Sequence, residues 1–255
     1  MMENAILDLI HAHGSVRHYK PDPVPASIVE RIVAAGQRAS TSSNMQTFTV
    51  VAVTDAEKRS ALAELCGGQS HIVQAPVFLA WCADRFRLER VNQMRGYEHN
   101  AETVENFLVA AIDAAIAAQN AALAAESLGL GICYIGSIRN NTAEIIKLLE
   151  LPEHVFPITG MTIGWPEKAP MIRPRLSQEA ILHWESYNTE QDAALLAYDQ
   201  VMIETGIYTD RQVPVPGRDG EMEAYGWLEH TARRTSQVTR KEMLSIIKKQ
   251  GFGMK

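Results

Sequence analysis

The stretch AAQNAALAAESLGLGICYIGSIRNN, residues 117–141, decides the fold. It begins inside an alanine-rich segment, 101–128, which predicts one long helix. Alanine on nearly every side permits close contact all round, so we expect this helix at the centre of the molecule or at a subunit interface. The chain then turns through glycines into 129–141, which predicts a strand that ends in glycine. Glycines after a helix and before a strand reverse the order of a dinucleotide-binding Rossmann unit, so that interpretation is rejected.

Helices and short strands alternate on both sides of this stretch. Further strands are predicted at 47–55, 76–84 and 155–166. Further helices are predicted at 4–12, 25–40, 55–68 and 142–151. The alternation is typical of a layered α/β or α+β domain.

The pattern changes after about residue 183, where the strand rhythm is lost. Segments 190–206 and 235–252 predict helices, and the polar, Pro- and Gly-containing segment 207–226 predicts a long exposed loop. A tail without a sheet of its own often packs on another subunit. We therefore expect a single domain over 1–255, in which 200–255 is a divergent C-terminal extension that packs on the partner subunit.

Composition excludes several classes of protein. The chain has 255 residues, of which 46% are hydrophobic, and this is enough for one large domain with a core, or for two small ones. The net charge of −6 argues against nucleic-acid binding by overall charge alone. Three cysteines without C-x-x-C spacing indicate reduced, buried thiols in a cytoplasmic protein. They are Cys66, Cys82 and Cys133.

No targeting or membrane segment is expected. The N-terminus has no basic region of the kind that opens a signal peptide. The most apolar long stretch, 107–125, holds Asp113, Gln119 and Asn120, so it indicates a buried helix and not a membrane span.

The familiar catalytic motifs are missing, and a distributed polar set takes their place. There is no G-x-S-x-G, H-E-x-x-H or phosphate-binding P-loop motif, and the spacing of His11 and His13 does not favour a metal site. In an extended segment His13, Ser15 and Arg17 point the same way. Other polar turns lie at 40–46, 67–71, 134–137 and 173–175. Each alone is explained by a cap, a turn or a solvated charge, but together they describe a large, flat, polar-edged ligand with a phosphate at one end.

These segments resemble one family. The chain carries, in order, HGSVRHY (13–19), QRASTSSNMQ (37–46), GGQSHIVQAP (67–76), FLAWCAD (78–84), the 117–141 stretch, LELPEHVFPITGMTIGWP (149–166) and RPRL (173–176). Their order and spacing are similar to those of the nitroreductase superfamily, most of all its oxygen-insensitive NADPH nitroreductases and NADPH–FMN oxidoreductases. The resemblance covers about residues 3–200 well and the rest loosely. It implies an α+β fold with a central mixed, mostly antiparallel sheet flanked by helices, in an intertwined homodimer that binds FMN non-covalently at the subunit interface.

The resemblance also implies which residues hold FMN. His13, Arg173 and Arg175 would bind the phosphate. Ser15 and Arg17 would lie along the ribityl chain and the N1/O2 edge, where Arg17 would stabilise the reduced, anionic flavin. The remaining residues placed against FMN are Gly14, Val16, Thr41, Ser42, Ser43, Gln46, Gln69, Ser70, His71, Ile72, Val73, Tyr134, Ile135, Gly136, Ser137 and Pro174.

Each of these segments has an expected role. The segment 41–46 would reach the flavin partly from the second subunit, and Gln69 and His71 would border the pyrimidine end. The backbone of 135–137 would offer N–H groups to N5 and O4. Gly14 stands where close relatives often have arginine, so one charged contact to the cofactor is lost.

The activity implied is hydride transfer from NADPH, or from NADH, through flavin N5 to a flat acceptor in ping-pong order. Nitroaromatics, quinones and flavins would be acceptors. The alternatives are a flavin reductase that supplies reduced FMN to a partner oxygenase, and an FMN-binding or redox-sensing protein without turnover. Arg211 and Arg218 would read the 2′-phosphate of NADPH, opposed by nearby acidic side chains, for a moderate NADPH preference. The acidic side chains are Asp210, Asp219, Glu221 and Glu223. Trp81, Trp165 and Trp184 could stack on an acceptor, but core packing is their expected role.

Overall fold

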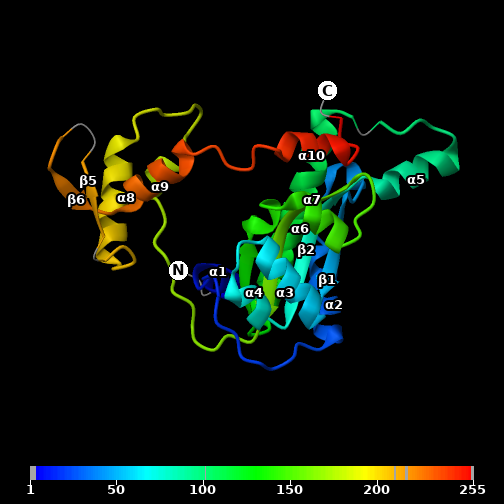
Figure 1. Ribbon diagram of the computed structural model, residues 1–255, viewed down its shortest axis with the longest axis horizontal. Coiled ribbons are helices and arrows are strands. Elements are labelled where there is room, and N and C mark those ends of the chain that lie inside the picture. The colour runs from blue at the N-terminus through cyan, green and yellow to red at the C-terminus, as the bar shows by residue number, and fades with distance from the viewer. Residues whose placement is uncertain (1–3, 101, 210, 216–217, 254–255) are drawn as a thin grey trace. The chain divides into compact units, whose positions relative to one another are not determined.

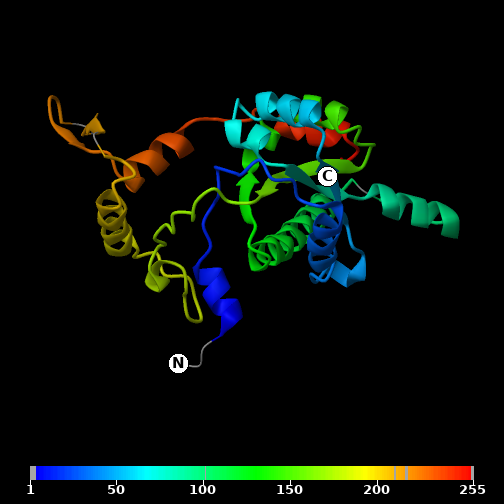
Figure 2. The ribbon, with the colours of Figure 1, turned by 90° about the horizontal axis from the view of Figure 1, so that it is seen from below.

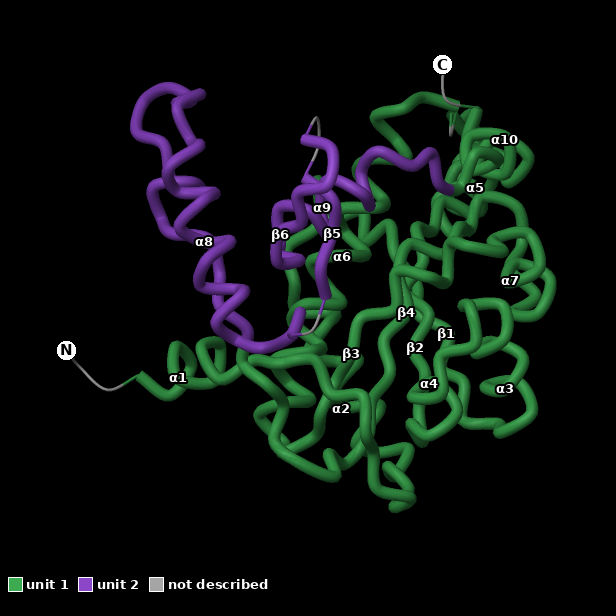
Figure 3. The backbone as a smooth tube through the Cα atoms, turned by 60° about the vertical axis from the view of Figure 1, so that its left-hand side comes forward, with its two compact units in different colours: residues 1–172, 240–255 green, residues 173–239 purple. Residues whose placement is uncertain are grey.

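The computed structural model describes residues 4–100, 102–209, 211–215 and 218–253. The chain divides into two compact units, which Figure 3 colours green and purple. Unit 1 comprises residues 1–172 and 240–255, and unit 2 comprises residues 173–239. Each unit is described by itself below.

Unit 1 is built on a four-stranded antiparallel sheet with the strand order β1-β2-β4-β3. The strands are β1 (Phe48–Val53), β2 (Val77–Asp84), β3 (Gly131–Ile135) and β4 (Val155–Gly164). All four lie where the sequence predicts strands, and the α+β class with an antiparallel sheet flanked by helices is confirmed.

Helices cover both faces of this sheet (Figures 1 and 2). The helices of unit 1 are α1 (Ala5–His11), α2 (Ala26–Gly36), α3 (Ala56–Leu65), α4 (Ser70–Gln74), α5 (Phe86–Arg95), α6 (Val104–Ser127), α7 (Thr142–Leu148) and α10 (Met243–Lys249), with short 3₁₀ turns η1 (Ser42–Asn44) and η2 (Gly136–Arg139). Because side chains alternate along a strand, the fully buried β2 serves two cores. Val77, Leu79 and Trp81 pack in one core with α2 and α6. Phe78, Ala80 and Cys82 pack in the other with α3 and α7.

Helix α6 is the central helix that the sequence predicts. Its buried face consists almost entirely of alanine and packs within the core that includes α2 and the sheet. Gly36 of α2 permits the close approach of the two helices, because a Cβ there would lie 3.0 Å from the carbonyl oxygen of Ala117. By length and composition alone α6 is apolar enough to cross a membrane. Its alanine face, however, is packed in the core, as expected for a buried helix.

The C-terminal residues return to unit 1 of the same chain. Ile247 and Phe252 pack with Phe107 of α6 and Phe156 of β4. The single helix predicted over 235–252 is wrong, because α9 ends at Ser236 and α10 begins only at Met243. Helix α5 was not predicted at all, since it has no buried residue and therefore no apolar stripe to reveal it. Packing of the 200–255 extension on a partner subunit stays a prediction.

Unit 2 contains more regular structure than the sequence indicates. Its elements are η3 (Gln178–Ala180), α8 (Asp192–Glu204), β5 (Gln212–Pro214), β6 (Met222–Ala224) and α9 (Trp227–Ser236). The expectation of a loop over 207–226 is wrong, because β5 and β6 pair as an antiparallel hairpin. The strands escape sequence reasoning because they are three residues long and bury only Val213. Aromatic contacts such as that of Tyr198 with Trp227, 5.1 Å between ring centroids, form the unit's small core.

Candidate functional site

Residues 13–19 form an extended strap along β3, one of the two edge strands of the sheet. The backbone N–H of Val16 donates to the carbonyl oxygen of Ile132 at 2.8 Å, and the Tyr19 hydroxyl donates to the carbonyl oxygen of Val16 at 2.8 Å. Gly14, Val16 and Tyr19 are buried, while Ser15 and Arg17 are exposed. The strap therefore presents its polar side chains on one side, as the alternation in the sequence predicts.

Two glycines let the strap lie this close to its neighbours. A Cβ on Gly131 would overlap the Val16 side chain. A Cβ on Gly14 would lie 2.8 Å from the carbonyl oxygen of Met171 and from the Cβ of Pro170. A larger side chain at position 14, such as arginine, would therefore require a shift of the 170–171 backbone.

His13 is held by a carboxylate that sequence reasoning missed. Its Nδ1 lies 2.6 Å from Oε1 of Glu126, near the C-terminal end of α6. The side chain of Glu126 is only 12% exposed, and its Oε2 is buried without a hydrogen-bond partner among the described residues. A lone carboxylate at the end of an alanine-rich helix was the available signal. This pair fixes one ring nitrogen of His13 and leaves the other for a ligand.

The segments around Gln69 and Ser137 come together beside the strap. The Gln69 amide donates to Ser137 Oγ and to the carbonyl oxygen of Cys66, the latter at 2.9 Å. His71 is buried, and its Nε2 has no hydrogen-bond partner among the described residues. Burial lowers the pKa of His71, and the positive charges of Arg17 and His18 lower this pKa further. Arg17 of the strap thus lies within electrostatic range of His71.

Open space adjoins this group of segments. Among the described residues, a Cβ on Gly136 would have only Arg139 Nη2 within 4 Å, at 3.7 Å, so space for a ring is open on that side, while the Gly136 carbonyl oxygen accepts from Arg240 Nη2 at 3.1 Å. Ser15 and Arg17 line a groove of about 190 Å³ together with Lys168. Lys168 is a further cation that the sequence analysis did not single out. The site therefore combines an open glycine backbone with a cationic groove.

Some predicted residues lie there in ways that limit their role. The side chains of Ile72 and Ile135 are buried in the core, so they can meet a ligand only through their backbone. Val73 is 46% exposed and Ser70 opens helix α4. Tyr134 is half-buried, and its hydroxyl donates to Gln119 Oε1 at 3.3 Å.

The turn at 41–46 is anchored elsewhere on the same chain. Buried Asp113 of α6 accepts a hydrogen bond from the backbone N–H of Ser42 at 3.1 Å and two from Thr47. Asp113 and Glu126 both lie on α6, so their anchor points are separated by about 20 Å at a rise of about 1.5 Å per residue. The structure thus groups the strap with 69–71 and 134–137, and it does not bring the 41–46 turn to them within one chain.

The predicted arginines after residue 172 belong to unit 2. Arg175 Nη1 donates to the carbonyl oxygen of Arg173 at 2.9 Å and to that of Pro174 at 3.2 Å. Arg218 is paired with Glu221 at 3.2 Å, whereas Arg211 lies over the Tyr225 ring at 5.6 Å. Asp210 lies outside the described residues. Phosphate binding by these arginines stays a prediction.

The tryptophans divide between core and surface. Trp81 is fully buried, and Trp165 packs against the same core while its Nε1 donates to the carbonyl oxygen of Pro23 at 3.2 Å. Core packing is confirmed for these two. It is wrong for Trp184, which is 78% exposed. The thiols of Cys66, Cys82 and Cys133 are buried, as expected.

Comparison with known proteins identifies the family. A model of the Nitroreductase family matches residues 10–165, and a model of the Nitroreductase family, C-terminal domain, matches residues 173–255. The chain is 37% identical to an FMN reductase [NAD(P)H] of Bacillus subtilis, over 98% of each chain. It is 35% identical to an oxygen-insensitive NADPH nitroreductase of Salmonella typhimurium, over 96% of this chain and 97% of that one. A solved structure, the NADPH:FMN oxidoreductase from Vibrio harveyi complexed with NAD+, superposes with a TM-score of 0.87 at 32% identity and covers 99% of this chain and 100% of its own.

Proposed function

The chain belongs to the nitroreductase family, and on this premise we propose that it is an FMN-dependent NADPH oxidoreductase. Its electron acceptors are flat electrophiles: nitroaromatics, quinones and flavins. The observation that carries the proposal is a cationic groove in unit 1, lined by Ser15, Arg17 and Lys168, whose Arg17 lies within electrostatic range of the buried His71. Similar proteins of nearly equal length are named FMN reductase and NADPH nitroreductase.

The residues at this site fit FMN. The cations Arg17 and Lys168 line the groove, where a phosphate or the negative N1/O2 edge of the ring would lie. The unpartnered Nε2 of buried His71 needs a polar partner, which the pyrimidine end of the ring supplies. The open backbone at Gly136 leaves room for the ring itself. When bound, FMN supplies the acceptance and donation of hydride at N5, and no side chain has to act as a nucleophile.

We infer that the protein works as a homodimer. Val104, Leu108, Ile112 and Ile116 lie four residues apart on α6 and are between 40% and 54% exposed, so they form an apolar stripe along one face of the helix. The distance along α6 between the strap and the 41–46 turn supports a turn that serves the flavin of the other subunit. Such an interface should bury more than about 2,000 Å² in total. Light scattering should report a yellow dimer; a colourless monomer of 28.2 kDa would contradict both parts of the inference.

A second candidate function is favoured by one comparison. The relative at 37% identity is named an FMN reductase, so the acceptor could be free flavin, with reduced FMN passed to a partner oxygenase. We propose a cytoplasmic location for either role, which is compatible with three buried cysteine thiols.

The test is a steady-state panel of acceptors against NADPH and NADH. We expect turnover with nitroaromatics and quinones, and parallel lines in double-reciprocal plots, because one site serves both substrates in turn. A protein that reduces only free flavin would favour the second candidate. A protein that binds FMN but reduces no acceptor would contradict both.

A further inference from the structure

The turn that joins α2 to β1 holds an unusual backbone. Ser43, Asn44 and Gln46 have φ angles of 48°, 55° and 53°, all in the left-handed region, and none of them is glycine. Residues in this region persist only where their surroundings over-determine them. Glycine would adopt these φ angles without strain, so a turn with a purely structural role would favour glycine at these positions. This turn carries a side chain at all three of them instead.

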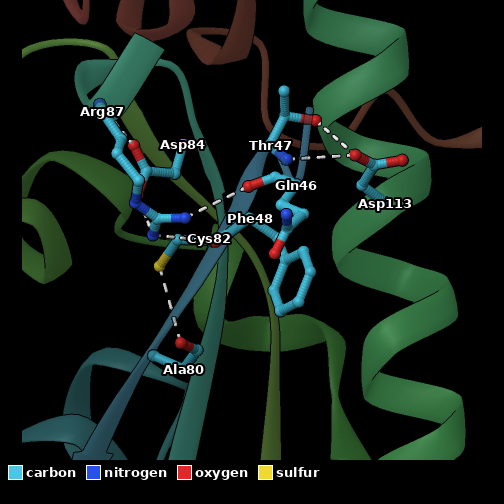
Figure 4. Close-up of polar contacts among 8 residues, drawn as sticks. All are labelled: Gln46, Thr47, Phe48, Ala80, Cys82, Asp84, Arg87 and Asp113. Atoms are coloured by element: carbon cyan, nitrogen blue, oxygen red, sulfur yellow. Dashed lines mark hydrogen bonds and ion pairs between the residues drawn. The ribbon is translucent and has the colours of Figure 1, made fainter. Parts of the chain in front are cut away.

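A buried carboxylate holds this turn from one side. Asp113 is 2% exposed, and its Oδ1 accepts from the Ser42 backbone N–H at 3.1 Å. Its Oδ2 accepts from the Thr47 backbone N–H at 3.1 Å and from the Thr47 hydroxyl at 2.7 Å. Thr47 is itself fully buried. One carboxylate thus spans the two ends of the strained segment, as Figure 4 shows for Thr47.

A second carboxylate holds the turn from the opposite side. Asp84, at the end of β2, is 6% exposed and pairs with Arg87 Nη2 at 3.1 Å. Arg87 donates to the carbonyl oxygens of Gln46 and Phe48, each at 3.3 Å (Figure 4). The Asp84 backbone N–H donates to the carbonyl oxygen of Thr47 at 2.9 Å. Backbone groups on both sides of Thr47 are therefore fixed before any ligand arrives.

The side chains at the tip of the turn remain available. Ser42, Ser43, Asn44 and Gln46 are all exposed, and the contacts of the Gln46 amide, to Asn44, are both long at 3.5 Å. A buried carboxylate among the alanines of α6 is costly to desolvate, and an apolar residue there would pack the helix as well. The presence of the Asp113 carboxylate is therefore explained by its hydrogen bonds to Ser42 and Thr47.

We propose that Asp113 is a positioning residue for cofactor binding: it pre-sets the 42–47 turn so that its exposed polar side chains meet FMN without further ordering. The Asp84–Arg87 pair has the same role from the other side. The inference rests on the proposed function, and it assigns to these residues no contact with the cofactor. Pre-setting matters because a mobile turn would lose conformational entropy on binding, which lowers affinity.

The test compares the affinity for FMN with the stability of the apo-protein. Asp113→Asn keeps the shape but replaces one acceptor oxygen by an amide that cannot accept, and Thr47→Val removes only the hydroxyl bond. FMN is removed, and its dissociation constant is measured from the quenching of its fluorescence on rebinding. We expect Asp113→Asn to raise this constant about ten- to a hundred-fold, and Thr47→Val about three- to ten-fold.

A control separates positioning from general loss of stability. Val29→Ala, in the core between α2 and the sheet, should lower the melting temperature of the apo-protein and leave the FMN dissociation constant within about two-fold. If Asp113→Asn and Thr47→Val bind FMN no more weakly than Val29→Ala, the inference is wrong. If Asp113→Asn does not fold, Thr47→Val against the same control decides. Failure of the unaltered protein to bind FMN would instead contradict the proposed function.

Discussion

The strap at 13–19 and the turn at 42–47 are both expected to touch FMN, but they are held differently. Along most of its length the strap is held by its main chain, because Val16 bonds to β3 and small residues let it lie flat, while its first residue, His13, is paired with Glu126. The turn is held by side chains from distant elements, Asp113 of α6 and Arg87 of α5. A segment fixed by its backbone tolerates changes of its exposed side chains without moving. A segment fixed by buried side chains depends on a few atoms far away in the sequence.

The largest effect is expected from a strap substitution that leaves the fold intact. Arg17→Ala removes an exposed cation whose backbone stays anchored, so FMN affinity should fall about ten- to a hundred-fold, equivalent to about 1.5–3 kcal/mol. The melting temperature of the apo-protein should stay within about 2 °C of the unaltered protein. Fluorescence titration and thermal unfolding check the two halves of this prediction. Unchanged FMN affinity would mean that the strap is not the cofactor site.

A turn substitution should change stability and affinity together. Arg87→Ala leaves the buried Asp84 carboxylate without its cation and frees the carbonyl oxygens of Gln46 and Phe48. Because Arg87 is itself 54% exposed, we expect a loss of only about 1–2 kcal/mol in the free energy of unfolding. Chemical denaturation measures it, and FMN affinity should fall in parallel. Loss of affinity without loss of stability would remove the contrast between turn and strap.

The hairpin of unit 2 offers a third case, in which two exposed arginines differ in their partners. Arg218 is already paired with Glu221, while Arg211 lies over an aromatic ring and keeps its charge for a phosphate. Arg211→Ala should lower kcat/KM for NADPH about ten-fold, or about 1.4 kcal/mol, and Arg218→Ala about two-fold. NADH kinetics should barely change, and added salt should shrink the difference. Equal losses with both nucleotides would mean that the hairpin shapes the pocket and does not read the 2′-phosphate.

The smallest effect is expected from pH, and on the strap side it concerns His71. Burial lowers the pKa of His71 in the folded chain below the ordinary value of about 6.5. As pH falls through that value, the unfolded chain takes up a proton that the folded chain does not, so the folded state loses stability. The loss ends where folded His71 is itself protonated. His99, whose pKa burial also lowers, contributes with the same sign.

The measurement is the melting temperature of the apo-protein in buffers from about pH 7.5 to about pH 5, a range that brackets the ordinary histidine pKa of about 6.5. His71→Asn should make the decline shallower, while the Arg87→Ala variant should keep the slope of the unaltered protein. Identical slopes with and without His71 would show that another group causes the acid loss.

Sequence reasoning succeeded where a local pattern decides the outcome. Alternation along 13–17 predicts which side chains the strap exposes, and alanines at helical spacing predict the central place of α6. Asp113 and Glu126 were missed as anchors because their roles depend on segments 71 and 113 residues away. Only the fold brings such partners together. Both were visible only as carboxylates out of place in an apolar helix.

Most of the elements that were not predicted from the sequence lack a local hydrophobic pattern. Helix α5 and strands β5 and β6 bury little or nothing, so they carry no hydrophobic period to read. The interruption between Ser236 and Met243 was missed because the amphipathic pattern of α10 was extended backward through polar residues. Helix α4 was missed for another reason: it buries Ile72 but is only five residues long, too short to show a helical period.

The most direct test of the central claim is anaerobic mixing of the FMN-loaded protein with NADPH. Absorbance of the oxidised flavin should bleach within seconds, and the colour should return when a nitroaromatic or quinone is added. NADH should bleach the flavin more slowly than NADPH does. In steady-state kinetics kcat/KM should be about ten-fold to a few hundred-fold lower with NADH than with NADPH. Bleaching by neither nucleotide would contradict the account and leave a protein that binds flavin without using it.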